Sequence, residues 1–238
     1  EYEGAVRHFV QTLLSDPERS PFLVDFLPFQ RRLARFGLLN GLTQTLLKLT
    51  VPGVPDVYQG NETWQFSLVD PDNRRPVDYR ALQGALAELT EDDRDRATLA
   101  AELLERLPDG RAKLYVTSQA LALRNARPAL FLAGDYAALD ALGPRAEHLC
   151  AFARRHGDEE LLVAAGRWYA RLAGEDDAPP VAGTWAGTRL ALPTAGAGRR
   201  YRNLLDGRLT AAQAGEDGPE LDLAGVFAHL PVALLLRE

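Results

Sequence analysis

The stretch "LTVPGVPDVYQGNETWQFSLVDPDNRRPVDY", from Leu49 to Tyr79, joins a short apolar run to a long polar segment. Two prolines and a glycine interrupt the apolar run, and Asp56 to Gln59 after them are predicted to form a short strand. Asp, Asn and Arg residues crowd the segment that follows. Because binding residues are often carried on loops held by a rigid scaffold, this loop is predicted to face a ligand.

The residues before this stretch show helical periodicity. Apolar side chains in residues 1–14 recur at spacings of three and four, which predicts a first helix ending at Asp16-Pro17. Ser20-Pro21 has the form of an N-cap followed by proline at the first helical position, so a second helix is predicted up to Leu49. Gly37 and Gly41 in this helix indicate either a break or a close contact.

Three more helices are predicted after the polar loop. Asp78 can cap a helix through "YRALQGALAELT", and a second helix covers about Arg94 to Leu107. A turn at residues 108–110 leads to "RAKLYVTSQALALRNA", which is expected to end before Pro128. This order of helix, strand, loop and helix is typical of the end of a (β/α)8 barrel, where loops after the strands build the active-site face.

The second half of the chain changes to strand-like patterns. "HLCAFARRHGDEELLVAAGRWYARL" holds two apolar runs joined by a hairpin signal. Further strands are predicted in "TRLALP", "YRNLLDGRLTAA" and "PVALLLRE", separated by loops rich in Gly, Asp and Pro. The fold class is therefore α+β. Residues 1–127 form the mostly helical C-terminal end of a (β/α)8 barrel with its eighth strand and loop, and residues 128–238 form an antiparallel β-sandwich.

Composition narrows the classes of partner. The chain has 238 residues and a net charge of −6, which argues against nucleic acid or an anionic membrane as the main partner. Its one cysteine, Cys150, lies in an apolar context and is expected to be a buried thiol rather than half of a disulfide. No apolar run has the length of a membrane span, and a cytoplasmic location is predicted by default.

The chain contains no Met and begins inside an apparent helix. We therefore expect it to be a piece of a longer protein, so that the missing N-terminal portion would be a partner in forming the active site.

"GVPDVYQGNE", from Gly53 to Glu62, resembles the motif of the eighth barrel strand in the α-amylase superfamily, glycoside hydrolase family 13. Its pattern G-x-P-x-x-Y-x-G-x-E is matched at every fixed position. "DPDNRRPVDY" resembles the loop that follows in that superfamily. Over a longer range the chain resembles the maltooligosyltrehalose synthase family, through "SLVDPDNRRPVDY", "AFARRHGDEELLVAAGR" and "PVALLL". This resemblance covers nearly the whole chain.

The resemblance implies an intramolecular transglucosylation. The last α-1,4 bond at the reducing end of a maltooligosaccharide is broken, and the released glucose is rejoined through an α,α-1,1 linkage. Retaining chemistry of this kind uses two carboxyl groups ~5 Å apart. In this superfamily they lie after earlier barrel strands, which would precede Glu1. No residue here is therefore assigned a catalytic role, no cofactor or metal is expected, and the chain alone is predicted to be inactive.

Six residues are predicted to contact the maltooligosaccharide substrate: Tyr58, Glu62, Asp70, Asp72, Arg74 and Arg75. Asp70 and Arg74 resemble a pair that holds a sugar in related enzymes, since a carboxylate accepts from hydroxyls and a guanidinium donates to them. The alternative is an internal salt bridge that only orders the loop. Asp72 and Arg75 have the same two alternatives.

The aromatic residues and Glu62 also have two readings. Tyr58 can stack on a sugar or fill the top of the barrel, and Glu62 can contact sugar or brace the active-site floor through buried hydrogen bonds. Trp64 and Phe66 can cover a sugar face or pack in a core. Trp168 and Trp185 are expected in the sandwich core.

Two other functions remain open. The first is another α-amylase-superfamily enzyme that hydrolyses or isomerises glucans, and the second is a non-catalytic glucan-binding module.

Overall fold

The computed structural model describes residues 1–91, 94–174, 179–192 and 196–238. By its internal contacts the chain divides into two units, Glu1–Leu38 and Leu39–Glu238. The first unit contains α1 (Tyr2–Leu14) and the beginning of α2 (Pro21–Thr50). The second unit contains the end of α2 and all the remaining helices and strands.

In the first unit, the predicted helix boundaries are confirmed. α1 ends before Asp16, and α2 begins at Pro21, where the Leu23 amide donates to Ser20 Oγ at 3.4 Å. No residue of α1 is buried, so the apolar stripe that predicted this helix is exposed, with Phe9 as one of its members.

The helix α2 is continuous, so the predicted alternative of a break at Gly37 or Gly41 is wrong. The other alternative, a close contact, is confirmed at Gly41. A Cβ there would lie 2.8 Å from the Trp64 ring, so only glycine fits at this approach.

The helices that follow confirm the predicted order. The predicted ones are α4 (Tyr79–Leu89), α5 (Arg96–Glu105) and α6 (Arg111–Ala126), with the 3₁₀ turn η1 (Leu107–Asp109) before α6; α3 (Asp70–Asn73) and α7 (Pro128–Leu132) were not predicted. Asp78 caps α4 as expected, since its carboxylate accepts from the Ala81 amide at 3.0 Å. The predicted strand at Asp56 to Gln59 is wrong, because no described strand pairs with these residues.

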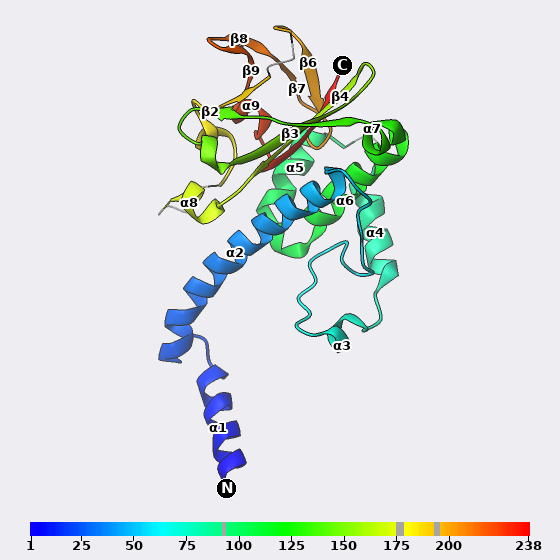
Figure 1. Ribbon diagram of the computed structural model, residues 1–238. Helices are drawn as coiled ribbons and strands as arrows, with labels where there is room; N and C mark the ends of the chain where they lie inside the picture. Colours follow the sequence, from blue (N-terminus) through cyan, green and yellow to red (C-terminus); the bar gives the residue numbers. More distant parts are fainter. Residues whose placement is uncertain (92–93, 175–178, 193–195) are drawn as a thin grey trace. The chain divides into compact units, whose positions relative to one another are not determined.

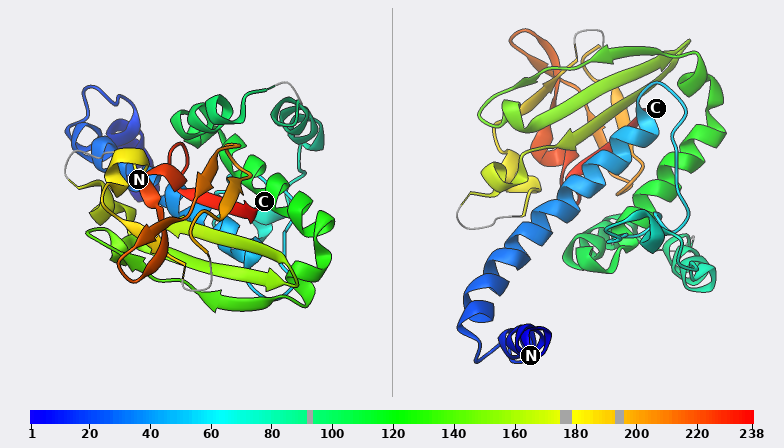
Figure 2. Two further views of the ribbon diagram at one scale, coloured as in Figure 1. Left: turned by 90° about the horizontal axis from the view of Figure 1, so that it is seen from above. Right: turned by 60° about the horizontal axis from the view of Figure 1, so that its bottom comes forward.

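The strands form two sheets, and every strand pair is antiparallel. The six-stranded sheet has the order β1 (Asp135–Ala138), β3 (Leu149–His156), β4 (Glu159–Gly166), β10 (Val232–Arg237), β6 (Arg200–Asn203) and β7 (Leu209–Ala211). The four-stranded sheet has the order β2 (Ala141–Leu142), β5 (Arg189–Ala191), β9 (Gly218–Asp222) and β8 (Gln213–Gly215). The predicted hairpin is confirmed as β3 and β4, which run side by side in Figure 2.

Short helices connect the strands. They are η2 (Ala146–His148), α8 (Tyr169–Ala173), η3 (Ala182–Trp185) and α9 (Leu223–Val226). Trp185 is fully buried against Phe227, which confirms its predicted core position. Trp168 is 48% exposed, so its predicted core position is wrong. Its ring lies beneath the guanidinium of Arg167, which holds the indole at the surface.

The core of the second unit centres on β4 and β10. Every residue of β4 from Glu160 onward is buried, because strands pair with it on both edges and its neighbours cover both faces. Cys150 of β3 is only partly buried. Among the helices described by the structure, none is long and apolar enough to cross a membrane.

Polar contacts join the helices of this unit to the sheets. The Tyr115 hydroxyl of α6 donates to the Leu205 carbonyl at 2.8 Å, and Thr43 of α2 lies 2.8 Å from the Tyr169 hydroxyl. Arg154 of β3 is 1% exposed and donates to four backbone carbonyls, those of Thr50, Phe131, Gly134 and Asp135. The predicted domain boundary at Arg127-Pro128 therefore lies within one contact unit, and it remains a prediction.

Candidate functional site

The candidate site is the loop between α2 and α4, which Figure 1 shows on the opposite side of α6 from the sheets. The two ends of this loop meet. A Cβ on Gly60 would lie 3.1 Å from the Val77 side chain, and the Tyr79 hydroxyl donates to Gln59 Oε1 at 3.4 Å. We call residues 59–64 and 77–79 the neck of the loop and residues 65–76 its tip.

Trp64 attaches the neck to the helices. Its indole Nε1 donates to the Leu107 carbonyl at 2.6 Å, and its ring packs on Gly41 of α2. Thr63, the residue before Trp64, packs against Gly110 in the same way. A Cβ on Gly110 would lie 2.9 Å from the Thr63 side chain. Of the two readings of Trp64, packing is the one that the structure contains.

Lys113 of α6 is a second attachment point. It is 8% exposed, and its Nζ donates to Asn61 Oδ1 at 2.5 Å and to the Thr63 carbonyl at 3.0 Å. The same ammonium lies 5.5 Å from the centre of the Trp64 ring. Burial lowers the pKa of Lys113 to about 8; Lys48 lowers it further, and Glu62 acts in the opposite direction.

Glu62 lies in the same part of the neck. Its Oε2 is buried and has no hydrogen-bond partner among the residues that the structure describes. The predicted bracing through buried hydrogen bonds is therefore not made by this oxygen. A buried acceptor without a donor costs about 1–3 kcal/mol.

Arg124 holds the entrance to the loop. Its guanidinium donates to the carbonyls of Leu49 at 3.0 Å and Gly53 at 3.1 Å, and it stacks on the Phe131 ring at 4.7 Å. Burial lowers the pKa of Arg124. A cation at the C-terminal end of α2 satisfies carbonyls that the helix leaves free, which fixes where the chain leaves the helix.

The tip carries four of the six predicted site residues. α3 begins at Asp70, and the carboxylate of Asp70 pairs with Arg74 while Asp72 pairs with Arg75 at 2.6 Å. The Asp70 and Arg74 side chains are 66% and 72% exposed. The structure thus contains the ion pairs of the loop-ordering alternative, and it leaves the same four groups accessible to a ligand.

Apolar side chains of the loop are exposed as well. Tyr58 is 50% exposed, Phe66 81% and Leu68 90%. The core-packing alternative for Phe66 is therefore wrong. Among the described residues, no group of three or more His, Cys, Asp or Glu side chains could hold a metal ion.

Comparison with known proteins shows which proteins the chain is similar to. No family model matches the chain. Two curated proteins from Mycobacterium tuberculosis, strains CDC 1551 / Oshkosh and ATCC 25618 / H37Rv, are provisionally named maltooligosyl trehalose synthase. Each is 40% identical to this chain over 203 residues, which is 84% of this chain and 20% of theirs. The chain is homologous to one part of the maltooligosyltrehalose synthases.

Solved structures support this relationship. A variant of maltooligosyltrehalose synthase from Arthrobacter ramosus is 36% identical and aligns with a TM-score of 0.71, covering 93% of this chain and 25% of that one. A second maltooligosyl trehalose synthase structure is 27% identical, with a TM-score of 0.65, and covers 100% of this chain and 26% of that one. The chain thus spans about a fifth of the length of its curated relatives and about a quarter of these structures.

The sequence analysis did not predict that Lys113 attaches the neck of the loop to α6. Lys113 lies in a helix whose sequence gives no sign that a lysine would be buried there, because long charged side chains usually reach solvent.

Proposed function

We propose that this chain is the C-terminal part of an enzyme that converts the reducing-end α-1,4 linkage of a maltooligosaccharide into an α,α-1,1 linkage. The observation that carries the proposal is the 40% identity over 203 residues to proteins named for that synthase. The retaining carboxyl groups would belong to a preceding N-terminal portion, which is the partner of this chain. The proposed description of its two regions is the end of a (β/α)8 barrel followed by an antiparallel β-sandwich.

In this proposal the loop between α2 and α4 binds sugar, chiefly through its tip. Asp70 and Arg74 are the main contacts, and Tyr58, Glu62, Asp72 and Arg75 are secondary ones. Exposed ion pairs are weak, so sugar hydroxyls can displace or join them at little cost. Pro71 and Pro76 stiffen the tip, which reduces the conformational entropy lost when a ligand binds.

The reaction is tested with the longer protein encoded by the same reading frame, incubated with maltopentaose. The proposed enzyme removes reducing ends without releasing glucose. An increase in reducing ends would indicate a hydrolase of the same superfamily instead. Binding of maltopentaose without any conversion would indicate a glucan-binding module.

The loop is tested in that same protein with Asp70→Ala and Arg74→Ala. Charged groups bonded to hydroxyls contribute ~1.5–3 kcal/mol, so each change should lower kcat/KM roughly ten- to a hundredfold. Arg19→Ala is the matched control, because Arg19 also forms an exposed ion pair, with Asp16, but outside the loop. If the loop variants match the control, the two ion pairs only order the loop.

The 238-residue chain by itself is expected to form no product. Formation of maltooligosyl trehalose by the pure chain would contradict the placement of the carboxyl groups outside it.

A further inference from the structure

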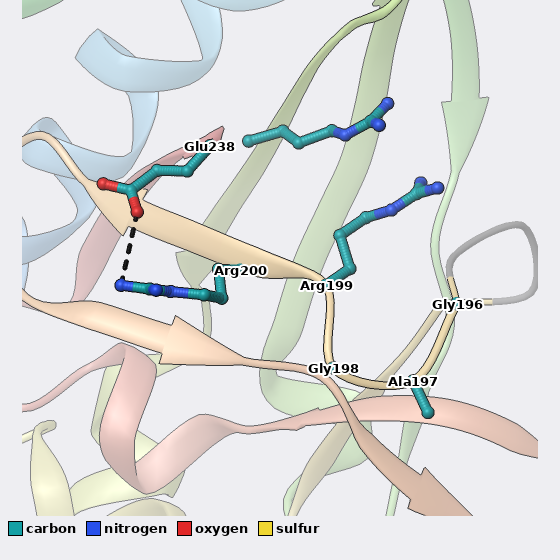
Figure 3. A pocket seen from close by; sticks show the side chains of 7 residues that line it. Gly196, Ala197, Gly198, Arg199, Arg200 and Glu238 are labelled. Carbon is teal, nitrogen blue, oxygen red and sulfur yellow. Dashed lines mark ion pairs between the residues drawn. The ribbon is translucent and has the colours of Figure 1, made fainter.

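A pocket lies in the sheet region, beside the first residues of β6 and the end of β10. It has a volume of about 480 Å³ and is lined by Gly196, Ala197, Gly198, Arg199, Arg200, Arg237 and Glu238. A volume of this size falls within the range of small-ligand sites. Figure 3 shows Gly196, Ala197 and Gly198 on the segment that leads into β6, with the side chains of Arg199 and Arg200 extending in opposite directions.

The backbone of the small-residue wall is accessible. A Cβ added to Gly196 or Gly198 would meet no atom of the described residues within 4 Å. Gly198 has φ +83°, a conformation that favours glycine. Its amide donates to the Ala212 carbonyl at 2.8 Å, and the Ala212 amide returns a bond of 2.8 Å to the Arg199 carbonyl. The wall is therefore fixed in place although its surface is bare.

The strand register determines the face of the sheet on which each arginine lies. β6 pairs with β10 so that Arg237 lies opposite Tyr201, and the Glu238 amide donates to the Arg200 carbonyl at 3.1 Å. Side chains that lie directly opposite on paired strands share a face, so Arg237 lies on the face of the buried Tyr201, and Arg200 and Arg202 lie on the other face. The pocket therefore takes its arginines from both faces at the end of the paired strands.

Positive charge exceeds negative charge around this pocket. Glu160 accepts from Arg155 at 2.6 Å and from Arg199 at 3.2 Å, so one carboxylate serves two guanidinium groups. Glu238 is likewise shared, by Arg200 and Arg202. Figure 3 shows the Glu238–Arg200 pair, with Arg199 extending away from it.

Arg237 is the least neutralised of these groups. Its guanidinium donates to the Asp158 carbonyl at 3.0 Å and makes no ion pair within the part of the chain that the structure describes. The Asp158 carbonyl carries no net charge, so this hydrogen bond does not neutralise the positive charge of Arg237. In a chain whose net charge is −6, a local excess of guanidinium groups is a specific feature rather than an average property.

The residues that line the pocket indicate which class of ligand it can bind. Among the described residues, no aromatic side chain lines the pocket, so it lacks the stacking surface that a neutral sugar ring uses. Planar guanidinium groups donate hydrogen bonds in a fixed fork that matches two oxygens of a tetrahedral, multiply charged phosphate. We propose that this pocket binds a small phosphate-bearing molecule, at a site separate from the candidate loop. The proposal does not depend on the proposed function.

The test is calorimetric titration of the 238-residue chain with inorganic phosphate at constant ionic strength. We expect saturable binding to one site, and Arg237→Gln should weaken it at least tenfold. Glutamine retains a donor for the Asp158 carbonyl while removing the charge. Arg80→Gln is the matched control, because Arg80 is an exposed arginine of α4 far from the pocket in sequence, and it should leave the affinity unchanged.

A second measurement keeps the test decisive if the variant is unstable. In the parent chain, phosphate should shift the backbone amide resonances of Gly196 and Gly198 and leave that of Gly84 in α4 unmoved. Equal affinity of Arg237→Gln and the parent, equal loss in Arg80→Gln, or unmoved glycine resonances would each overturn the proposal.

Discussion

The sheet core and the loop between α2 and α4 are held in different ways. In β4 and β10, burial extends over consecutive residues, so many apolar contacts share the work of fixing the backbone. The loop exposes Phe66 and Leu68 almost completely. It is fixed by a few polar contacts at the neck, chiefly those of Trp64 and Lys113.

The free energies of the two kinds of contact differ in size. Burying one large apolar side chain contributes about 1.5–3 kcal/mol, whereas an exposed ion pair contributes about 0–1 kcal/mol. The sheet can therefore lose one contact and keep its structure. The loop depends on single side chains at the neck, and its tip is left free to respond to a ligand.

Hydrogen exchange gives the largest expected contrast. Amides of β4 and β10 should exchange only through global unfolding, and those of residues 65–69 through local motion. We expect the strand amides to exchange at least ~1,000-fold more slowly, since global unfolding costs about 5 kcal/mol or more. Comparable rates in the two regions, measured by mass spectrometry or NMR, would remove the distinction between them.

Arg154→Met tests the polar contact on which the sheet region relies most. It leaves four backbone carbonyls without their buried donor, and we expect the free energy of unfolding to fall by about 3–5 kcal/mol. Urea unfolding measures this change. Arg80→Met, which removes an exposed arginine from α4, should change it by less than about 0.5 kcal/mol. Similar midpoints for both variants would show that Arg154 is dispensable.

Lys113→Met tests the neck. It removes the donor to Asn61 and Thr63, and we expect a loss of about 1–3 kcal/mol together with faster proteolysis within residues 65–76. Proteolysis that is unchanged would show that Trp64 alone holds the neck.

The same lysine should make stability depend on pH. Its native pKa of about 8 lies below the ordinary value of 10.5, so between these values the unfolded chain binds a proton that the native chain does not. The stability of the parent relative to Lys113→Met should therefore rise as the pH rises from about 8 towards 10.5. Lys48→Met removes a positive charge that lowers the pKa of Lys113. In this variant the pH range over which stability rises should therefore be narrower. A flat difference between parent and variant across these pH values would contradict the lowered pKa.

The smallest effect concerns the tip. A double-mutant cycle of Asp70→Ala and Arg74→Ala should give a coupling energy of no more than about 1 kcal/mol, because both side chains are mostly exposed. The coupling should weaken further in high salt. A coupling well above this value would mean that the pair braces the loop and that the tip is not free.

Local sequence signals predicted much of the fold. Asp78 as a cap, Ser20-Pro21 as a helix start and "HGDEE" as a hairpin are all decided by residues close together in the chain. The failures have non-local causes. Asp56 to Gln59 has strand-like composition, but a strand needs a pairing partner, and Trp168 lies at the surface because two arginines stack on it.

The candidate site shows the same limit. The charged tip was visible in the sequence, and its ion pairs were one of two stated alternatives. The neck was not visible, because Lys113 and Asn61 are far apart in the chain and meet only after α6 has packed beside the loop. Which of the tip residues contact sugar remains a prediction.

The closed neck also makes the tip a replaceable module. Since Gly60 meets Val77 and Gln59 meets Tyr79, the chain leaves and re-enters the folded body at almost the same place. Lengthening such a segment adds only a slowly growing entropic cost, roughly 0.6 kcal/mol for each doubling of its length. Residues 65–76 can therefore be exchanged for longer, shorter or differently charged sequences with the scaffold intact, so this segment can vary without a redesign of the fold.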